Sequence, residues 1–294
     1  MPLTKTGLTA CVNGQFLALE DATVHIEDRG FQFADGVYEV IACFGGTFLD
    51  LQAHLQRLER SCQAIAIELP CSLAELEQLI AQTYQRNPYR DAMLYVQITR
   101  GVAPRAHLVS EKLKPTMVIT SRALPMPSDE KINTGVRAIT LPDMRWKRCD
   151  IKSIALLASV LGKQEATRQG ADEAFWLDDE GHVLEGCATN CFAVINGALV
   201  THPLDHQVLG GITRDMALGL AKKQGMIIEQ RPWHLHEAGL SECMMSSTTN
   251  AIMPVCQIND QVIGSGKPGH VSIALRQQMF QAFEALKRGD SPHE

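Results

Sequence analysis

The sequence feature that most constrains the fold is a short proline-containing segment between two regions rich in β-strand patterns. The segment Ala123–Asp129 reads ALPMPSD, and its two prolines favour extended backbone over a helix. On both sides, strand-type runs bounded by turn residues outnumber runs with helical periodicity. The pattern predicts a mixed α+β or α/β fold with a large antiparallel component. We expect a small N-terminal α/β domain (1–122), a linker (123–129) and a larger C-terminal domain (130–294).

Hydrophobic periodicity locates the helices and strands expected in the two regions. Apolar residues that recur every three or four positions predict helices over 51–65, 73–84, 151–169, 213–225, 234–240 and 270–287. Alternating or β-branched runs predict strands or hairpins over 10–17, 37–44, 47–51, 93–99, 116–121, 135–140, 172–200, 226–231, 242–246 and 254–264. The Asn13-Gly14 pair predicts a tight hairpin turn, because both residue types tolerate positive φ.

Charge and cysteine content exclude several classes of protein. The chain of 294 residues has a formal net charge of −6 and no dense run of Lys or Arg, which argues against nucleic acid as a partner. No apolar run is long enough to cross a membrane. The nine cysteines follow no disulfide or zinc spacing, and His234 and His236 have no third ligand in the pattern. We therefore expect reduced thiols, no metal site and a cytoplasmic protein.

Lys152 is the candidate catalytic residue. It lies at the predicted start of the helix 151–169, where the positive end of the helix dipole disfavours a second cation. Arg145, Lys147 and Arg148 add positive charge just before it. Both effects would lower the pKa of the lysine, as a Schiff-base lysine requires. On spacing alone, a solvated lysine on the polar side of a helix is the stronger explanation.

Two short segments could bind an anion, and one carboxylate could face a cofactor ring. The segment 209–213 (LGGIT) places glycines before a predicted helix with Thr213 as its N-cap, and such helix ends bind phosphate. The segment 246–250 (SSTTN) could supply further donors. Glu185 ends a predicted strand and could hold a pyridine nitrogen protonated. A capped loop, a polar turn and an exposed glutamate are the ordinary explanations of these three features.

The order of these motifs along the chain resembles that of the class IV aminotransferases. The matching segments are 27–40 (EDRGFQFADGVYEV), 54–58 (HLQRL), 100–107 (RGVAPRAH), 149–153 (CDIKS), 161–166 (LGKQEA), 185–186 (EG), 209–215 (LGGITRD) and 246–249 (SSTT). The segment 100–107 is similar to a stretch found in D-amino-acid transaminases in particular. The resemblance extends from about residue 10 to residue 265.

The resemblance implies a fold-type IV architecture, in which pyridoxal 5′-phosphate lies between two domains. Lys152 would then be the catalytic residue, holding the cofactor as a Schiff base and moving a proton between the substrate and the cofactor. Glu185 would pair with the pyridine nitrogen. The other cofactor-binding residues that it implies are Arg57, Ile212, Thr213, Ser247 and Thr248 at the phosphate and Leu209 against the ring.

The resemblance also implies a substrate site and a homodimer. Tyr38, Arg105 and His107 would bind the α-carboxylate of the substrate, with Arg105 and His107 contributed across the subunit interface. A guanidinium suits this task because it binds a carboxylate through paired, charge-assisted hydrogen bonds. The implied activity is transamination between a D-amino acid of the D-alanine or D-glutamate type and a 2-oxo acid such as pyruvate or 2-oxoglutarate.

Other activities on the same scaffold are alternatives. A branched-chain L-amino-acid transaminase would not need the Arg105 and His107 pair, and the sequence around Tyr38 lacks that group's glycine-threonine-glycine pattern. An aminodeoxychorismate lyase differs around the same tyrosine, and an (R)-amine transaminase would modify the carboxylate site. A cofactor-binding protein without activity is disfavoured by the intact Lys152 and Glu185.

Three residues depart from the pattern of the family. Cys187, Ala188 and Asn250 stand at positions where relatives commonly carry serine. Fewer hydroxyl groups near the cofactor would affect substrate specificity more than the class of reaction.

Overall fold

The computed structural model describes residues 7–109 and 112–288. By its contacts the chain divides into a first unit, Met1–Pro125 with Ile151–Ala155, and a second unit, Met126–Asp150 with Leu156–Glu294. The chain therefore passes into the second unit inside the proline-containing segment and returns once to the first unit. Within the described ranges, no helix combines the length and apolar character that a membrane span requires.

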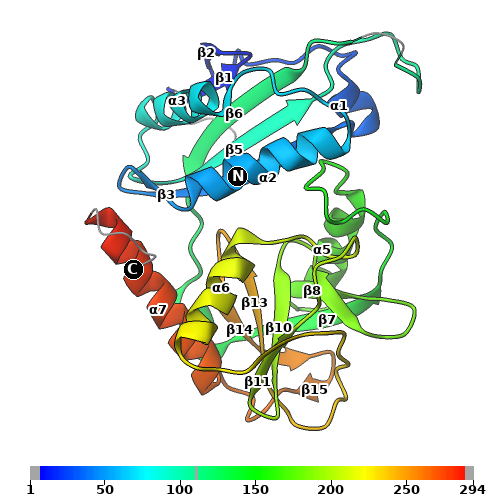
Figure 1. The fold of residues 1–294 in the computed structure, drawn as a ribbon, viewed down its shortest axis with the longest axis vertical. Coiled ribbons are helices and arrows are strands. Elements are labelled where there is room, and N and C mark those ends of the chain that lie inside the picture. Colours follow the sequence, from blue (N-terminus) through cyan, green and yellow to red (C-terminus); the bar gives the residue numbers. More distant parts are fainter. Residues whose placement is uncertain (1–6, 110–111, 289–294) are drawn as a thin grey trace. The chain divides into compact units, whose positions relative to one another are not determined.

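The first unit is a six-stranded antiparallel sheet with helices on one face (Figure 1). The strand order is β2-β1-β6-β5-β3-β4. The strands are β1 (Thr9–Val12), β2 (Gln15–Ala18), β3 (Gly36–Phe44), β4 (Thr47–Phe48), β5 (Asp91–Thr99) and β6 (Thr116–Ala123). The helices are α1 (Arg29–Phe33), α2 (Leu51–Ala64) and α3 (Leu73–Gln85). The sequence did not predict the short helix α1.

Alternation along β3 separates the two faces of this sheet. Val37 and Ile41 point into a core that contains Leu55 and Leu58 of α2, because successive side chains of a strand face opposite sides. Tyr38 lies between them in sequence and occupies the other, half-buried face. The packed core thus fixes which side of the sheet presents Tyr38.

Local sequence explains two turns in this unit. Asn13 and Gly14 both adopt positive φ, 51° and 84°, between the antiparallel strands β1 and β2, so the predicted hairpin is confirmed. Helix α3 begins with a capping box, in which Ser72 accepts from the N–H of Glu75 and Glu75 accepts from the N–H of Ser72.

The second unit is built around a nine-stranded mixed sheet that closes on itself. The strand order is β12-β11-β10-β13-β14-β7-β8-β9, and the sheet closes into a ring because β9 also pairs with β10. The short strand β15 pairs with β14 outside this order. The strands are β7 (Val136–Pro142), β8 (Glu173–Leu177), β9 (Val183–Gly186), β10 (Asn190–Ile195), β11 (Ala198–Thr201), β12 (Ile228–Gln230), β13 (Leu240–Ser247), β14 (Ala251–Ile258) and β15 (Gln261–Val262). Its core includes Phe175 and Trp233.

Four helices accompany this sheet, and they correct several predicted boundaries. They are α4 (Asp129–Thr134), α5 (Leu157–Arg168), α6 (Ile212–Lys223) and α7 (His270–Lys287). The last of these matches its predicted range. The range 234–240 is not helical, because Trp233 and Leu235 are buried in the core by a chain that turns without helical hydrogen bonds. Helix α4 was not predicted.

The largest correction concerns the residues just before α5. The predicted helix 151–169 begins only at Leu157. The preceding residues lie instead along β3, where the N–H of Tyr38 donates to the carbonyl of Lys152 (2.9 Å) and the N–H of Ile154 donates to the carbonyl of Gly36 (3.1 Å). Ile151 is buried in the core of the first unit. Because the carbonyl of Lys152 and the N–H of Ile154 are hydrogen-bonded to β3, they are not available for hydrogen bonds within a helix.

Candidate active site

Lys152 is fixed through its backbone on both sides of its Cα. Its carbonyl accepts from Tyr38, and its N–H donates to Oγ of Ser61 (3.4 Å). The side chain extends from this anchored backbone, and its Nζ lies 4.4 Å from the centre of the Tyr38 ring. The predicted position of Lys152 at the start of a helix was wrong, because α5 begins only at Leu157.

Tyr38 has two polar neighbours on β5 that the sequence did not single out. Gln97 lies directly opposite Tyr38 in the ladder, and the ring of Tyr95 lies 5.7 Å from the Tyr38 ring between centres. The hydroxyl of Tyr95 donates to Oε1 of Gln97 (2.7 Å). Burial raises the pKa of Tyr95 to about 12, so this hydroxyl stays protonated. The alternation of β5 was the available signal, since Tyr95 and Gln97 interrupt an apolar strand at every second position.

Arg57 is held in place by a buried carboxylate. Its Nε donates to Oε1 of Glu39 (2.7 Å) and its Nη2 to Oε2 (2.9 Å), while Nδ1 of His54 is 2.8 Å from the same Oε2. His54 and Arg57 share one face of α2, because they are three residues apart. Glu39 is fully buried in β3. This pairing fixes one edge of the guanidinium and therefore sets its direction.

The charges in this cluster follow from burial and pairing. Burial opposes ionisation of Glu39, but the charge and hydrogen bonds of Arg57, together with His54, lower its pKa to about 2. Burial lowers the pKa of His54 against the opposing effect of Glu39. A neutral His54 then donates from Nδ1 to the carboxylate. Sequence reasoning missed Glu39 and His54, although a glutamate at an inward position of an apolar strand is itself a signal.

The segment that carries Arg105 and His107 is fixed by a buried arginine. Arg29 donates to the carbonyls of Ala106 (2.6 Å) and His107 (3.3 Å), and it is paired with Asp35 at 2.8 Å. Arg105 and His107 are exposed. Among the described residues, no hydrogen bond joins either side chain to Tyr38 of the same chain.

Both exposed side chains lie beside one aromatic ring. The guanidinium carbon of Arg105 is 5.0 Å from the centre of the Phe33 ring, and the His107 ring is 5.6 Å from it between centres. Phe33 ends the short helix α1, so α1 and the 105–107 segment present these groups together.

In the second unit, Glu185 is a buried carboxylate with three donors. It is 6% exposed and accepts from Nη1 of Arg145, from Nδ2 of Asn190 (3.1 Å) and from the N–H of Leu209 (3.0 Å). The predicted strand-end glutamate is therefore a fixed anion. Arg145 was noted in the sequence only as a nearby charge, and its pairing with Glu185 was missed.

Arg145 is in turn fixed by Asp143 and by the loop that precedes α6. It donates to both carboxylate oxygens of Asp143 (2.9 Å each) and to the carbonyl of Gln207 (2.9 Å). Burial opposes its charge, but the Asp143 bonds and the charge of Glu185 outweigh that effect and raise the pKa of Arg145. Arg145 is thus charged at neutral pH.

Asn190 links the carboxylate to the two segments expected to bind an anion. It stands opposite Glu185 of β9 and opposite Ser246 of β13, so the three residues form a row across adjacent strands. Its Nδ2 donates to Glu185 and to the carbonyl of Leu209 (2.8 Å). Oγ of Ser246 is buried without a hydrogen-bond partner among the described residues, which leaves a polar atom free for a ligand. Asn190 was not predicted as a site residue, whereas Ser246 belongs to the segment 246–250 that was expected to supply donors.

Helix α6 begins beside Asn190 with open backbone donors. Its N-cap is Gly211, with no side-chain cap, so the prediction of Thr213 as N-cap was wrong. Ile212 and Thr213 lie in the first turn, where amide groups have no intrahelical acceptor. A Cβ at Gly211 would lie 1.9 Å from Oδ1 of Asn190, which explains why the chain has glycine where the helix starts against β10.

The turn 247–250 follows Ser246 directly. Oγ of Ser247 accepts from the N–H of Asn250 (3.2 Å) and lies 3.5 Å from Oγ1 of Thr249. Thr248 is half-buried within the same turn. The local bonds explain why hydroxyl-bearing residues are concentrated in these few positions.

These groups have the chemistry that pyridoxal 5′-phosphate requires. The second unit offers a fixed carboxylate for a ring nitrogen and an uncapped helix end for a phosphate. The first unit offers an amine over a tyrosine ring and a directed guanidinium. The unpartnered Ser246 hydroxyl is a feature that a bound phosphate group would explain.

Comparison with known proteins identifies the chain's relatives. Residues 36–258 match the family model described as Amino-transferase class IV. The chain is 41% identical to the D-alanine aminotransferase of Bacillus licheniformis over 87% of this chain and 90% of that protein. It is 38% identical to the D-alanine aminotransferase of Listeria monocytogenes over 92% of this chain and 94% of that protein.

Solved structures show the same fold. The branched-chain amino acid aminotransferase of Escherichia coli is 25% identical, with a TM-score of 0.87 and coverage of 94% of both chains. The branched-chain amino acid aminotransferase of Thermobaculum terrenum is 26% identical, with a TM-score of 0.82 and coverage of 95% of this chain and 94% of that chain. A further branched-chain amino acid aminotransferase, solved with pyridoxamine 5′-phosphate, is 26% identical, with a TM-score of 0.85. The predicted fold class is confirmed.

Proposed function

Since this chain belongs to the class IV aminotransferase family, we propose that it transfers an amino group between a D-amino acid and a 2-oxo acid with pyridoxal 5′-phosphate as cofactor. The observation that carries the proposal is the 41% identity to a D-alanine aminotransferase over 87% of the chain. D-alanine or D-glutamate as donor and pyruvate or 2-oxoglutarate as acceptor fit this class. When bound, the cofactor supplies the carbonyl that receives the amino group and a ring that delocalises electrons.

Lys152 would hold the cofactor and transfer the proton. Its backbone is fixed through Tyr38 and Ser61, so only the side chain moves between these tasks. Once released by a substrate amine, Nζ would be a neutral base that takes the proton from the substrate Cα. Its place over the Tyr38 ring would hold the amine on the side of the cofactor from which the proton is taken.

Glu185 would keep the ring nitrogen of the cofactor protonated. An anionic carboxylate is needed for this, and Glu185 is paired with the guanidinium of Arg145. The bonds from Asn190 and Leu209 direct its second oxygen. Leu209 would also support one face of the ring.

Side-chain and backbone donors would bind the phosphate. Arg57 would supply a charge-assisted hydrogen bond, and the backbone of Ile212 and the hydroxyl of Thr213 would act at the start of α6. Ser247 and Thr248 would add hydroxyl donors from the turn after β13.

The substrate α-carboxylate would be bound by Tyr38 together with Arg105 and His107 of a second copy of the chain. Exposed apolar side chains support a homodimer: Leu108 is 81% exposed beside the 105–107 segment, and Leu157 is 71% exposed at the start of α5. The side of Cα on which the carboxylate is held decides whether the D or the L enantiomer reacts. A cytoplasmic location agrees with nine free cysteines.

The alternative is transamination of branched-chain L-amino acids. It is favoured by one observation, namely that the similar solved structures are branched-chain amino acid aminotransferases. Their identities of 25% and 26% are well below the 41% shared with a D-alanine aminotransferase.

The test is the absorbance spectrum of the cofactor-loaded protein before and after addition of D-alanine, with L-alanine and L-leucine in parallel. Conversion to the pyridoxamine form by D-alanine alone is the expected result. Conversion by L-leucine alone would establish the alternative. A spectrum that no amino acid changes would contradict transamination itself.

A further inference from the structure

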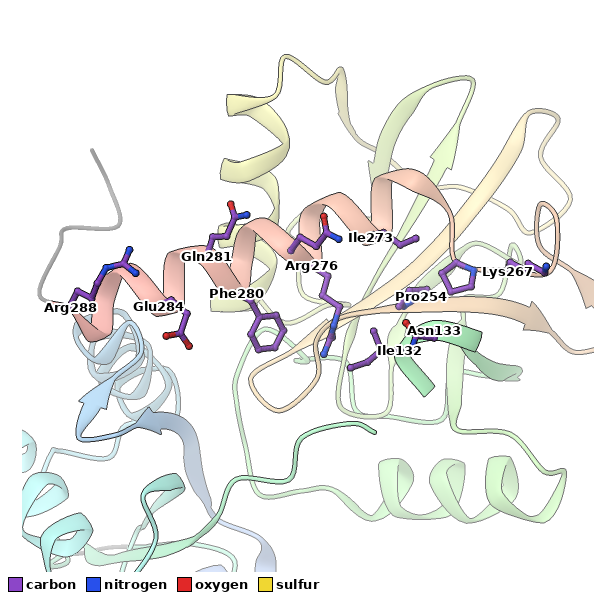
Figure 2. Close-up of a pocket in the computed structure, with 12 residues that line it drawn as sticks. Ile132, Asn133, Pro254, Lys267, Ile273, Arg276, Phe280, Gln281, Glu284 and Arg288 are labelled. Atoms are coloured by element: carbon purple, nitrogen blue, oxygen red, sulfur yellow. The ribbon is translucent and has the colours of Figure 1, made fainter. Parts of the chain in front are cut away.

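The second unit contains a pocket that the proposed reaction does not use. It has a volume of about 730 Å³ and lies between α7, α4, β14 and the residues just before α7 (Figure 2). Figure 2 shows Arg276 and Phe280 on the same side of α7, pointing towards Ile132 of α4. Binding sites for small molecules commonly have volumes of roughly 300–1,000 Å³.

Arg276 is a buried cation without an acidic partner among the described residues. It is 6% exposed, and its Nη1 donates to the carbonyls of Asn250 (2.7 Å) and Ile252. Burial lowers its pKa, and the distant charge of Asp129 opposes this shift. Buried charges are usually paired, because an unpaired one is costly to remove from water. Arg276 thus makes no ion pair with an acidic side chain among the described residues.

The geometry of Arg276 leaves one edge of its guanidinium for a ligand. Both of its hydrogen bonds to protein use Nη1, and no described residue offers an acceptor to Nε or Nη2. These two donors form a planar fork that matches the two oxygens of a carboxylate. The guanidinium carbon lies 4.8 Å from the centre of the Phe280 ring, so an apolar surface borders the fork.

The remaining lining makes the pocket positive overall and apolar on its walls. Lys267 and Arg288 line it together with Arg276, and Glu284 is its acidic lining residue. Glu284 is already paired with Lys287 outside the pocket at 2.6 Å. Ile132, Pro254 and Ile273 supply apolar walls. A monoanion with an apolar body suits this lining better than a phosphate, which would bring more charge to apolar walls.

We propose that this pocket binds a small carboxylate with an apolar body, its carboxylate on the Nε–Nη2 edge of Arg276 and its body against Phe280 and Ile132. The site lies wholly within the second unit and does not depend on the proposed transamination. Arg276 would then contact the bound carboxylate with its Nε–Nη2 edge and the carbonyls of Asn250 and Ile252 with Nη1.

The probe for this site is phenylacetate, titrated calorimetrically into the cofactor-loaded protein, with neutral phenylacetamide as its isostere. We expect one phenylacetate per chain and at least tenfold weaker binding of phenylacetamide, because only the anion meets the fork. Arg105→Ala should leave phenylacetate binding unchanged, since Arg105 belongs to the proposed substrate site. No binding, or equal binding of the two probes, would overturn the proposal.

Two substitutions on α7 complete the test without removing the bonds that Arg276 makes to backbone. Phe280→Glu places a carboxylate inside the pocket and should weaken phenylacetate binding at least tenfold. Gln278→Glu is the matched control, because Gln278 is bonded to Gln224 on α6 and does not line the pocket. Unchanged binding in Phe280→Glu, or loss in Arg105→Ala, would place the ligand elsewhere and refute the assignment.

Discussion

At the scale of single residues, Lys152 is positioned by the edge of a strand. Lys152→Ala should abolish turnover and the spectral signature of covalently held cofactor, while the fold is retained because both anchoring bonds use backbone atoms. Absorbance spectra and steady-state rates are the measurements. Lys147→Ala is the control, because Lys147 is an exposed lysine five positions earlier. Wild-type turnover by the Lys152 variant would exclude the proposed chemistry.

The ion pair of Arg145 and Glu185 predicts a loss of stability when the arginine is replaced. Arg145→Met would leave two carboxylates, Asp143 and Glu185, without their shared partner, and breaking such a buried pair costs about 3–5 kcal/mol. Denaturant unfolding measures this loss, and cofactor affinity should fall with it. The matched control is Arg148→Met: Arg148 pairs with Asp150 at the surface, where a pair contributes little to stability. Equal losses in the two variants would contradict the assigned role.

The low pKa of the buried Glu39 predicts how the stability of the fold depends on pH. Its folded-state pKa of about 2 is below the usual 4.5, so its contribution to stability is fully present above pH 4.5 and is lost as the pH falls towards 2. A depression of this size corresponds to about 3 kcal/mol. Denaturant unfolding between pH 5 and pH 2.5 should therefore show a smaller loss of stability in Glu39→Gln than in the wild type. Parallel curves would show that Glu39 is not ionised through this window.

The residues that the sequence singled out are those with a local motif. Lys152, Glu185 and the LGGIT segment lie in recognisable patterns, and the structure places each beside groups of suitable chemistry. Arg145 and Asn190 have no such pattern. They come together through strand register and a loop, and register depends on pairing between segments far apart in the chain.

At the scale of elements, the start of α6 allows a matched comparison of two glycines. Gly211→Ala would drive a Cβ into Oδ1 of Asn190 at 1.9 Å, which should displace Asn190 and weaken cofactor binding. Gly219→Ala lies in the same helix with nothing within 4 Å of the added carbon, and it should stabilise the protein by about 0.5–1 kcal/mol. Cofactor titration and thermal unfolding distinguish them. Unchanged cofactor binding and unfolding temperature in Gly211→Ala would refute the close packing of Gly211 against Asn190.

Helix and strand prediction succeeded where periodicity was long and local, as in α2, α3 and α7. It failed over 151–156, where the spacing of the apolar residues Ile151 and Ile154 fits a helix. In the structure, Ile151 packs in the core of the first unit and Ile154 bonds to the edge of β3. Two hydrogen bonds to β3 decide between these structures, and they join residues that are more than a hundred positions apart. Local propensity carries no information about such partners.

At the scale of the whole molecule, the exposed Arg105 and His107 predict complementation between inactive variants. If each active site takes Arg105 from the partner copy, Lys152→Ala and Arg105→Ala are inactive alone but restore one complete site in a mixed dimer. Random exchange should then recover about a quarter of wild-type activity. Activity after co-refolding or subunit exchange is the measurement. No recovery, in dimers shown to be mixed, would mean that Arg105 acts within its own chain.

The return of Ile151–Ala155 to the first unit has a consequence for how the chain can be divided. A fragment that ends at Pro125 contains all six strands of the first sheet but leaves Gly36 and Tyr38 at an uncovered edge, and such edges invite pairing with other chains. The segment that carries Lys152 therefore also covers that edge against association. Under the proposed function, the requirements of the chemistry and of protection against aggregation fall on the same five residues.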